Sequence, residues 1–299
     1  MGAYADINAE VFAALPSSLH YRGEPNDWVK VTRPGARLHS FLEGPVFDDA
    51  GRLWCVDVPY GRIFRVDPNG QWTLAHNGEG QPHGLARMQN ESAFAVADYR
   101  FGLMRFDPAR GAMSVLCDGI NSERFRGLGD VTSAGNGDLW FTDPGRSSLS
   151  DPTGRLLRLR AGEAKPDLVL ANLPYPNGVG VSPDGKLVYV AITRANAVWR
   201  LLADAPDPVY PMVGLWVHLS GGLGPDGISV HDSGHVAVAH GQAGRAWVFD
   251  ALGDVVARVR TPKGLWTTSV AWHPDGRRLA IVEAQTGSIY LADLTNVLS

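Results

Sequence analysis

The amino-acid sequence predicts an all-β protein, and more specifically a six-bladed β-propeller. Three observations lead to this prediction: the chain is rich in turn residues, it repeats a two-strand pattern, and the repeats return at a near-constant spacing. Among its 299 residues are 35 Gly and 20 Pro, a composition that suits short strands joined by turns rather than a bundle of helices. Because 44% of the residues are apolar, a chain of this length can also bury a sizeable core.

Each repeat begins with a run of alternating apolar residues that follows a turn. These first runs occupy residues 51–57, 92–98, 137–143, 185–191, 234–240 and 276–283. A second alternating run follows each of them after a short polar loop, at residues 62–67, 102–107, 155–159, 197–201, 245–250 and 288–293. Alternation with a period of two is typical of half-buried strands. Copies that return after about forty to fifty residues are expected of four-stranded blades placed around an axis.

The last repeat ends after its third strand, near Asp293, so the ring needs an outer strand from elsewhere in the chain. We expect residues 28–32, with the sequence Trp-Val-Lys-Val-Thr, to supply that strand and to close the ring without an open edge. Residues 1–27 would then form a leader of uncertain structure and residues 28–299 the propeller. Together, residues 1–299 are expected to form a single domain.

Composition also excludes several classes of partner. The 27 basic and 31 acidic residues give a formal net charge of −4 without a basic run, so we expect no nucleic-acid partner. No stretch approaches the roughly 20 continuous apolar residues of a membrane helix, so we expect no membrane partner. Asp6 and Glu10 lie in a first segment that has neither the basic start nor the apolar centre of a secretory signal. We therefore expect a cytoplasmic protein in which Cys55 and Cys117 are reduced core residues.

The innermost strand of each blade lines the central channel of a propeller, and its first residues lie near the axis. In this sequence those starts share one variable residue followed by a small one, usually Gly. The variable residues expected at the axis are Glu43, His83, Asn177, Asp226 and Thr268, with a gap at Gly129. Two carboxylates, an amide and a histidine gathered together favour a cation, and oxygen ligands suit hard divalent ions. The alternative is a wet channel whose polar residues bind only water.

The order of these motifs resembles the gluconolactonase and regucalcin-like (senescence marker protein) lactonase family. The similarity covers residues 42–294 and rests on four motifs, which are Glu-Gly-Pro-Val-Phe at 43–47, Gly-Asp-Leu-Trp-Phe-Thr-Asp-Pro at 137–144, Pro-Asn-Gly-Val at 176–179 with Ser-Pro-Asp-Gly at 182–185, and Gly-Pro-Asp-Gly at 224–227. The resemblance implies a six-bladed propeller that opens lactone rings, with one divalent cation held by Glu43, Asn177 and Asp226. Some members of that family hydrolyse organophosphates. The family's Asn-Asp pair in blade three reads Gly129-Asp130 here, so one side chain beside the metal or the substrate is absent.

Lactone hydrolysis needs a polarised carbonyl, an activated water and a stabilised oxyanion, and a divalent ion meets the first and third needs. Calcium is the ion that we expect first, with zinc, magnesium, manganese and iron(II) as alternatives. Asp226 is the candidate base that accepts the water proton, and its alternative role is that of a ligand only. His83 is expected to contact the substrate, and its alternatives are a base, a ligand of a softer metal or a structural residue.

Further candidate substrate contacts lie in loops between second and third strands, which open on the face of the axial cluster. These candidates are Arg100, Arg146, Arg194, His240 and Glu283, together with Asp130, which is also interpreted as structural. Arginines suit a hydroxylated or carboxylated ring, and the alternative for each of them is surface decoration.

The sequence thus predicts a metal-dependent hydrolase that opens a small lactone of a sugar acid or a related hydroxy acid. The alternatives are a propeller esterase or phosphotriesterase, a relative repurposed for non-hydrolytic chemistry, and a non-catalytic binding platform with a structural metal. The small-molecule lactone is the partner that we expect, and the sequence carries no prediction of oligomeric state.

Overall fold

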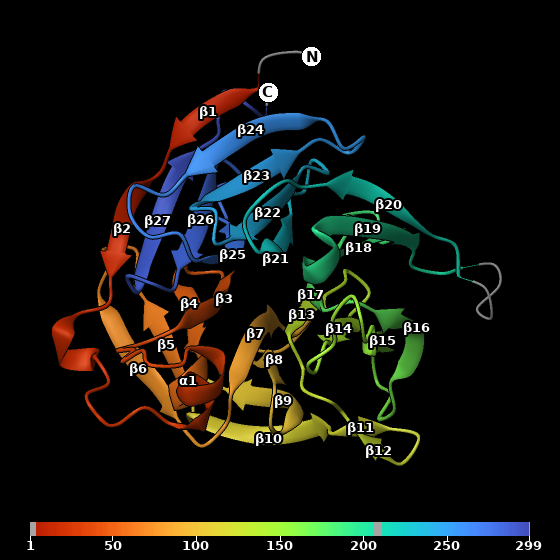
Figure 1. Ribbon diagram of the computed structural model, residues 1–299, viewed down its shortest axis with the longest axis horizontal. Coiled ribbons are helices and arrows are strands. Elements are labelled where there is room, and N and C mark those ends of the chain that lie inside the picture. Colours follow the sequence, from red (N-terminus) through yellow and green to blue (C-terminus); the bar gives the residue numbers. More distant parts are fainter. Residues whose placement is uncertain (1–3, 206–210, 299) are drawn as a thin grey trace.

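Six antiparallel sheets surround a central channel in the computed structural model, which describes residues 4–205 and 211–298 (Figure 1). From the channel outward, the first blade consists of β3 (Leu42–Phe47), β4 (Leu53–Asp57), β5 (Arg62–Val66) and β6 (Trp72–Asn77). The second blade consists of β7 (Pro82–Arg87), β8 (Phe94–Asp98), β9 (Gly102–Asp107) and β10 (Ala112–Cys117). The third blade consists of β13 (Asp130–Ser133), β14 (Leu139–Asp143), β15 (Gly154–Leu159) and β16 (Asp167–Leu173). The fourth blade consists of β17 (Pro176–Val181), β18 (Leu187–Ile192), β19 (Ala197–Leu202) and β20 (Val213–His218). The fifth blade consists of β21 (Gly224–Val230), β22 (Val236–Gly241), β23 (Arg245–Phe249) and β24 (Val255–Arg260). The sixth blade consists of β25 (Thr267–Trp272), β26 (Arg278–Glu283), β27 (Ser288–Asp293) and β2 (Glu10–Ala14).

The predicted six-bladed propeller is therefore confirmed. Each pair of repeated runs in the sequence is the second and third strand of one blade. Because the strands of a blade are antiparallel, the start of each inner strand and the end of each second strand lie at the same mouth of the channel.

The ring is closed by an N-terminal strand, as expected, but the strand that we assigned to this role was wrong. Residues 28–32 belong to α1 (Asp27–Thr32), because the Asn26 side chain caps the helix by accepting the N–H of Val29 at 3.1 Å. The closing strand is β2, which pairs antiparallel with β27 and buries Ala13 against the last and first blades. The expected leader is thus largely structured.

Three smaller elements complete the N-terminal and blade-three regions. Strand β1 (Ala5–Asn8) adds in parallel to the outer edge of the fifth blade through β24, so both N-terminal strands lie against the last two blades (Figure 1). Strands β11 (Gly119–Ile120) and β12 (Glu123–Arg124) form a separate short hairpin between the second and third blades. Single-turn helices lie at Ser17–Leu19, Val58–Tyr60 and Thr193–Ala195.

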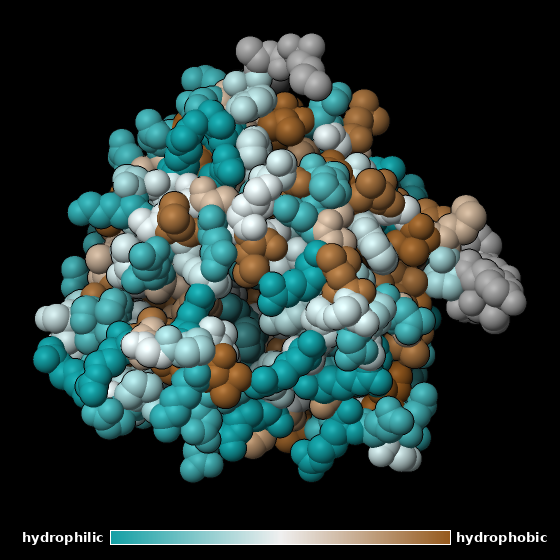
Figure 2. All heavy atoms as spheres, in the orientation of Figure 1, coloured by the Kyte–Doolittle hydropathy of each residue, from teal (hydrophilic) through white to brown (hydrophobic). Residues whose placement is uncertain are grey.

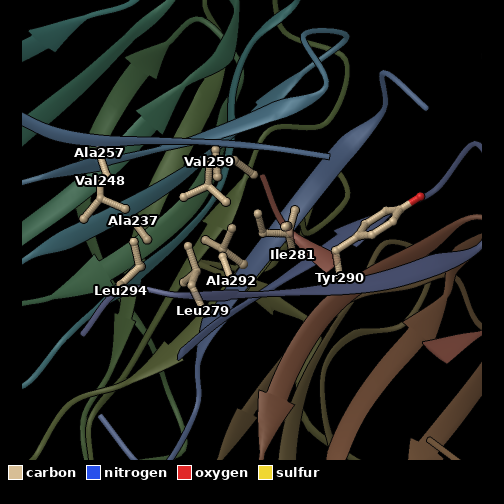
Figure 3. Close-up of a cluster of buried hydrophobic side chains, with 13 residues drawn as sticks. Ala237, Val248, Ala257, Val259, Leu279, Ile281, Tyr290, Ala292 and Leu294 are labelled. Atoms are coloured by element: carbon tan, nitrogen blue, oxygen red, sulfur yellow. The ribbon is translucent and has the colours of Figure 1, made fainter. Parts of the chain in front are cut away.

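The core consists of six apolar clusters, and each cluster lies between two neighbouring blades. Figure 3 shows the cluster between the fifth and sixth blades, where Ala237 lies toward Leu294 and Val259 lies toward Ile281. Cys55 and Cys117 are both free and buried, which confirms the prediction that they are reduced core residues. No helix of the described residues is long and apolar enough to cross a membrane.

One connection is much longer than the others that lead from an outer strand to the next inner strand. Residues 15–41 join β2 to β3, whereas residues 78–81 and 261–266 make the same kind of connection at other blades. The long connection carries α1, which lies over the first blade: Trp28 packs on Phe41 with ring centroids 5.1 Å apart, and Asn26 donates to the carbonyl oxygen of Pro59 (Figure 1). In the same orientation, the surface has a hollow near the centre of the ring (Figure 2).

Candidate active site

Four of the predicted axial side chains are brought to one mouth of the channel. Glu43 lies on β3, His83 on β7, Asn177 on β17 and Asp226 on β21, in each case within the first three residues of the inner strand. The pairing register of these strands shifts just at these positions. A bulge turns a side chain out of the regular alternation, and here it lets four blades present polar groups to the axis.

The four side chains form two short contacts. His83 Nδ1 lies 2.8 Å from Glu43 Oε2, and Asn177 Nδ2 donates to Asp226 Oδ1 at 2.6 Å. Glu43 and His83 are nearly enclosed, with side chains 12% and 13% exposed, and Asp226 is buried. The two pairs come from four different blades, so the site depends on the whole ring.

The electrostatics of the site favour a positive charge beside the two acids. Burial raises the pKa of Asp226 well above its usual range, and the neighbouring Glu43 carboxylate raises it further. Burial lowers the pKa of His83, but the carboxylates of Glu43, Asp98 and Asp130 together outweigh burial, so that the His83 pKa lies above its usual value. His83 Nε2 is buried without a hydrogen-bond partner among the described residues.

The donor set fits a divalent cation of the calcium type. Two carboxylates and the Asn177 amide supply oxygen ligands, which hard cations prefer. Among the described residues, no three His, Cys, Asp or Glu side chains are grouped closely enough to hold a metal by themselves. The amide of Asn177 would therefore have to complete a set of only two acids, Glu43 and Asp226, and the orphaned Nε2 of His83 provides a fourth polar atom.

Three of the predicted site residues use their side chains in hydrogen bonds to other parts of the protein. Thr268 is fully buried, and its hydroxyl donates to the carbonyl oxygen of Leu42 on the neighbouring inner strand at 2.8 Å, so its presence at the axis stays a prediction. Glu283 is fully buried, and its carboxylate accepts N–H groups of Trp266, Gln285 and Thr286 as well as the Thr286 hydroxyl.

His240 is likewise fully buried. Its Nε2 lies 2.8 Å from the carbonyl oxygen of Gly221, and its Nδ1 accepts the indole N–H of Trp247 at 3.1 Å. The polar atoms of Glu283 and His240 thus have partners within the protein. A buried group at the end of a second strand fixes the neighbouring loop, and this accounts for both residues.

The three predicted arginines are exposed and differ in their surroundings. Arg100 donates to the carbonyl oxygen of Glu79 at 2.7 Å, whereas Arg146 has no hydrogen-bond partner among the described residues. Arg194 lies 5.3 Å from the ring of Tyr175, and the pKa of that Tyr is raised by burial and by the carboxylates of the site. Of the three, Arg194 is therefore placed beside the cluster, and substrate contact by any of them stays a prediction.

Asp130 begins the inner strand β13 and lies near Glu43 and His83. Its Oδ1 accepts the N–H of Val131 at 2.8 Å and its Oδ2 the N–H of Val179 at 3.1 Å, so it joins the third blade to the fourth. These contacts support its structural interpretation. A Cβ at Gly129 would lie 2.9 Å from Pro144 Cγ, so the backbone here packs closely against the next loop.

Sequence reasoning missed four residues around the mouth: Arg33, Tyr99, Tyr175 and Trp266. The ring of Tyr99 lies 6.0 Å from that of His83, and Arg33 lies over the ring of Trp266. Tyr175 directly precedes the Pro176-Asn177 motif, and that position was a usable signal. Arg33 offered none, because the preceding residues were assigned to an outer strand.

Fold and site together define a six-bladed β-propeller with an oxygen-rich cluster at one mouth of its channel. More particularly, the chain belongs to the family of the SMP-30/Gluconolactonase/LRE-like region, whose model matches residues 41–285. This confirms the resemblance seen in the motifs.

Individual relatives are distant. The chain is 23% identical over 267 residues to a protein of Staphylococcus epidermidis named lactonase drp35, covering 85% of this chain and 80% of that protein. Among solved structures, a regucalcin of Agrobacterium tumefaciens, described as a calcium-binding protein, is 21% identical with a TM-score of 0.75, covering 97% and 95% of the two chains. A gluconolactonase of Xanthomonas campestris is 21% identical with a TM-score of 0.74, covering 85% and 86%. These structures share the fold of this chain.

Proposed function

We propose that this protein is a lactonase that opens a small lactone of a sugar acid or a related hydroxy acid, with a divalent cation at the mouth of the channel. The observation that carries the proposal is the convergence of Glu43, Asn177 and Asp226 from three separate inner strands. The lactonase names among the relatives support the reaction class, and the calcium-binding relative supports the ion.

In this proposal Glu43, Asn177 and Asp226 hold the cation, with calcium as the ion that their oxygens suit best. When bound, such an ion supplies Lewis-acid polarisation and stabilises the negative charge that develops on the lactone oxygen. Asp226 is the proton acceptor: its Oδ1 accepts from Asn177, while Oδ2 has no hydrogen-bond partner among the described residues.

His83 has two roles in the proposal. Through Nδ1 it fixes the orientation of the Glu43 carboxylate, and through its unpartnered Nε2 it meets a polar atom of the substrate. Water adds to the carbonyl carbon and gives a proton to Asp226, the bond from that carbon to the ring oxygen breaks, and the ring oxygen takes up a proton to become a hydroxyl. The net products are a hydroxy carboxylate and one proton. Arg194 and Tyr175 form one wall of the site beside the bound ring.

The test combines metal analysis with a pH-drop assay across neutral and charged lactones, simple esters and phosphotriesters, before and after chelation. We expect chelation to abolish lactone hydrolysis and calcium to restore it. Glu43→Gln should lower kcat/KM by at least about 100-fold, since lost partners of metal ligands alone cost 10–100-fold. Glu24→Gln, an exposed acid that pairs with Arg37 on the long connection, is the matched control and should keep full activity.

Activity that survives chelation, or full activity of Glu43→Gln, would contradict the proposed mechanism. Cleavage of phosphotriesters or simple esters without lactones would instead favour the broader propeller-esterase alternative. Tight metal binding without cleavage of any ester would favour a binding platform with a structural metal.

A further inference from the structure

The long connection between β2 and β3 brings one positive side chain to the acidic cluster. Arg33 directly follows α1, and its backbone N–H donates to the carbonyl oxygen of Val29 at 2.8 Å. The helix is in turn fixed to the first blade through Trp28 and Phe41. The position of Arg33 is therefore set by packing of its own segment, independently of the axial strands.

The guanidinium of Arg33 is held by two aromatic rings. It lies over the ring of Trp266, and its Cζ is 5.3 Å from the centroid of Phe41. Stacking on a ring uses the face of the guanidinium and leaves its in-plane N–H edge free for a planar anion. One of these nitrogens, Nη2, is buried and has no hydrogen-bond partner among the described residues.

Arg33 is close to the acids of the site without being paired to them. Burial lowers its pKa to about 10, and the Glu43 and Asp226 carboxylates act in the opposite direction, so the side chain is charged at neutral pH. No ion pair joins it to Glu43 or Asp226 within the part of the chain that the structure describes. Arg33 is therefore a positive charge at the same mouth as the two carboxylates, beside Phe41, which directly precedes β3.

The charge balance indicates what belongs there. A divalent cation between Glu43 and Asp226 would neutralise both carboxylates, and Arg33 would then leave an uncompensated, partly buried positive charge. Buried charges are normally paired, and a guanidinium pairs best with a carboxylate or a phosphate through two parallel hydrogen bonds. Arg194, on the other side of the mouth, adds a second positive charge stacked on Tyr175.

We propose that Arg33 is a specificity-determining residue that selects lactones bearing an anionic substituent, a carboxylate or a phosphate. This inference rests on the lactonase function proposed above and narrows its substrate class. Arg33 binds the substituent and takes no part in breaking the ester bond. The buried, unpartnered Nη2 is the donor that meets the anion.

The test uses lactones matched in ring but not in charge. Glucono-1,4-lactone and glucaro-1,4-lactone form one pair, in which the second carries a carboxylate. Glucono-1,5-lactone and 6-phosphoglucono-1,5-lactone form the other pair, in which the second carries a phosphate, so each charged lactone has a neutral lactone with the same ring. In Arg33→Met, which keeps the packing on Trp266, we expect kcat/KM for the charged lactones to fall by about 10–100-fold, the range of a charged hydrogen bond. The neutral lactones should change by less than about threefold. Which charged lactone loses more identifies the favoured substituent.

Two further variants separate charge from folding. Arg33→Lys keeps the charge without the planar edge and should lie between the wild type and Arg33→Met. Arg37→Met, on the same segment but exposed and paired with Glu24, is the matched control and should behave as the wild type. An equal loss of kcat/KM for charged and neutral lactones, in both Arg33→Met and Arg33→Lys, would show that Arg33 has only a structural role and would overturn the proposal.

A binding measurement makes the inference independent of turnover. Glucarate is titrated by calorimetry into the wild type and Arg33→Met with calcium chloride present. If no lactone is hydrolysed but the wild type binds glucarate and Arg33→Met binds it at least tenfold more weakly, the lactonase proposal fails and the anion-binding role of Arg33 stands. If both proteins bind glucarate equally, or neither does while neutral lactones are hydrolysed, the role of Arg33 is refuted and the lactonase proposal stands.

Discussion

Asp130 shows how a single half-buried acid links the site to the stability of the ring. Its two oxygens accept backbone N–H groups from the third and fourth blades, which favours the ionised form. Burial works against this and prevails, with help from the Glu43 carboxylate, so that the pKa of Asp130 is raised to about 7. Folding therefore raises the proton affinity of this carboxyl.

The raised pKa predicts a loss of stability with rising pH when no cation is bound. Below about pH 4 the carboxyl is protonated in both the folded and the unfolded chain. Between about pH 4 and 7 the unfolded chain binds fewer protons, so the free energy of unfolding falls with pH, and above about pH 7 the effect is complete. Its slope is at most about 1.4 kcal/mol per pH unit.

Chemical denaturation in the presence of a chelator measures this slope. Asp130→Asn cannot titrate, so its free energy of unfolding should fall less between pH 5 and pH 7 than that of the wild type. Asp232→Asn, at an exposed acid, is the control and should follow the wild type. Parallel curves for the wild type and Asp130→Asn would refute the assignment.

The axial residues could be predicted because each is followed by a small residue, and the close approach of neighbouring inner strands requires that residue to be small. A Cβ on Gly178 would lie 2.2 Å from the carbonyl oxygen of Asp226, so neighbouring inner strands approach too closely for any side chain. The pattern of a variable residue before Gly therefore reports the geometry of the axis. Thr268 is followed by Ser269 instead, and its hydroxyl is bonded to the carbonyl oxygen of Leu42 on the neighbouring inner strand. Arg33 could not be predicted, because no repeat in the sequence marks the connection that carries it.

At the scale of elements, two short N-terminal segments compete for one role. Residues 28–32 contain alternating apolar residues and β2 contains a continuous apolar run, and a strand of either would fit the open edge of the sixth blade. The difference lies in the capping residue: Asn26 starts a helix that buries Val29 completely and leaves Val31 exposed. A single capping residue such as Asn26 is a weak sequence signal for a helix. The repeated pairs of alternating runs, in contrast, predicted the second and third strands of every blade reliably.

The pairing of β2 with β27 predicts a sharp contrast between two adjacent alanines. Ala13 is 5% exposed and packs in the cluster between the last and first blades, whereas Ala14 faces solvent. Ala13→Glu places a charge in that cluster and should lower the free energy of unfolding by at least about 2 kcal/mol. Ala14→Glu should stay within about 0.5 kcal/mol of the wild type. Denaturant titration of both proteins makes the comparison, and equal stabilities would mean that β2 does not close the ring.

At the scale of the whole molecule, the ring is held together at two radii. At its rim, a strand from the start of the chain pairs with the last strand of the sixth blade. At its axis, Glu43, Asn177 and Asp226 come from the first, fourth and fifth blades, and His83 from the second. Between these radii, six apolar clusters join each blade to its neighbours. A cation bound at the axis would thus connect blades that are far apart in the sequence.

This arrangement predicts that calcium stabilises the entire fold rather than one loop. A ligand that binds only the folded chain adds about 2.7 kcal/mol at a concentration 100 times its Kd, which should raise the Tm by several degrees. We expect this shift in the wild type, a much smaller one in Glu43→Gln, and an unchanged one in the control Glu24→Gln. Thermal unfolding followed by circular dichroism, with chelator and with increasing calcium chloride, measures it. Because Glu43 also pairs with His83, the comparison is made between the calcium-induced Tm shifts of the wild type and Glu43→Gln and not between their absolute Tm values. A calcium-dependent Tm that is the same in both proteins would place the ion elsewhere and separate the acidic cluster from metal binding.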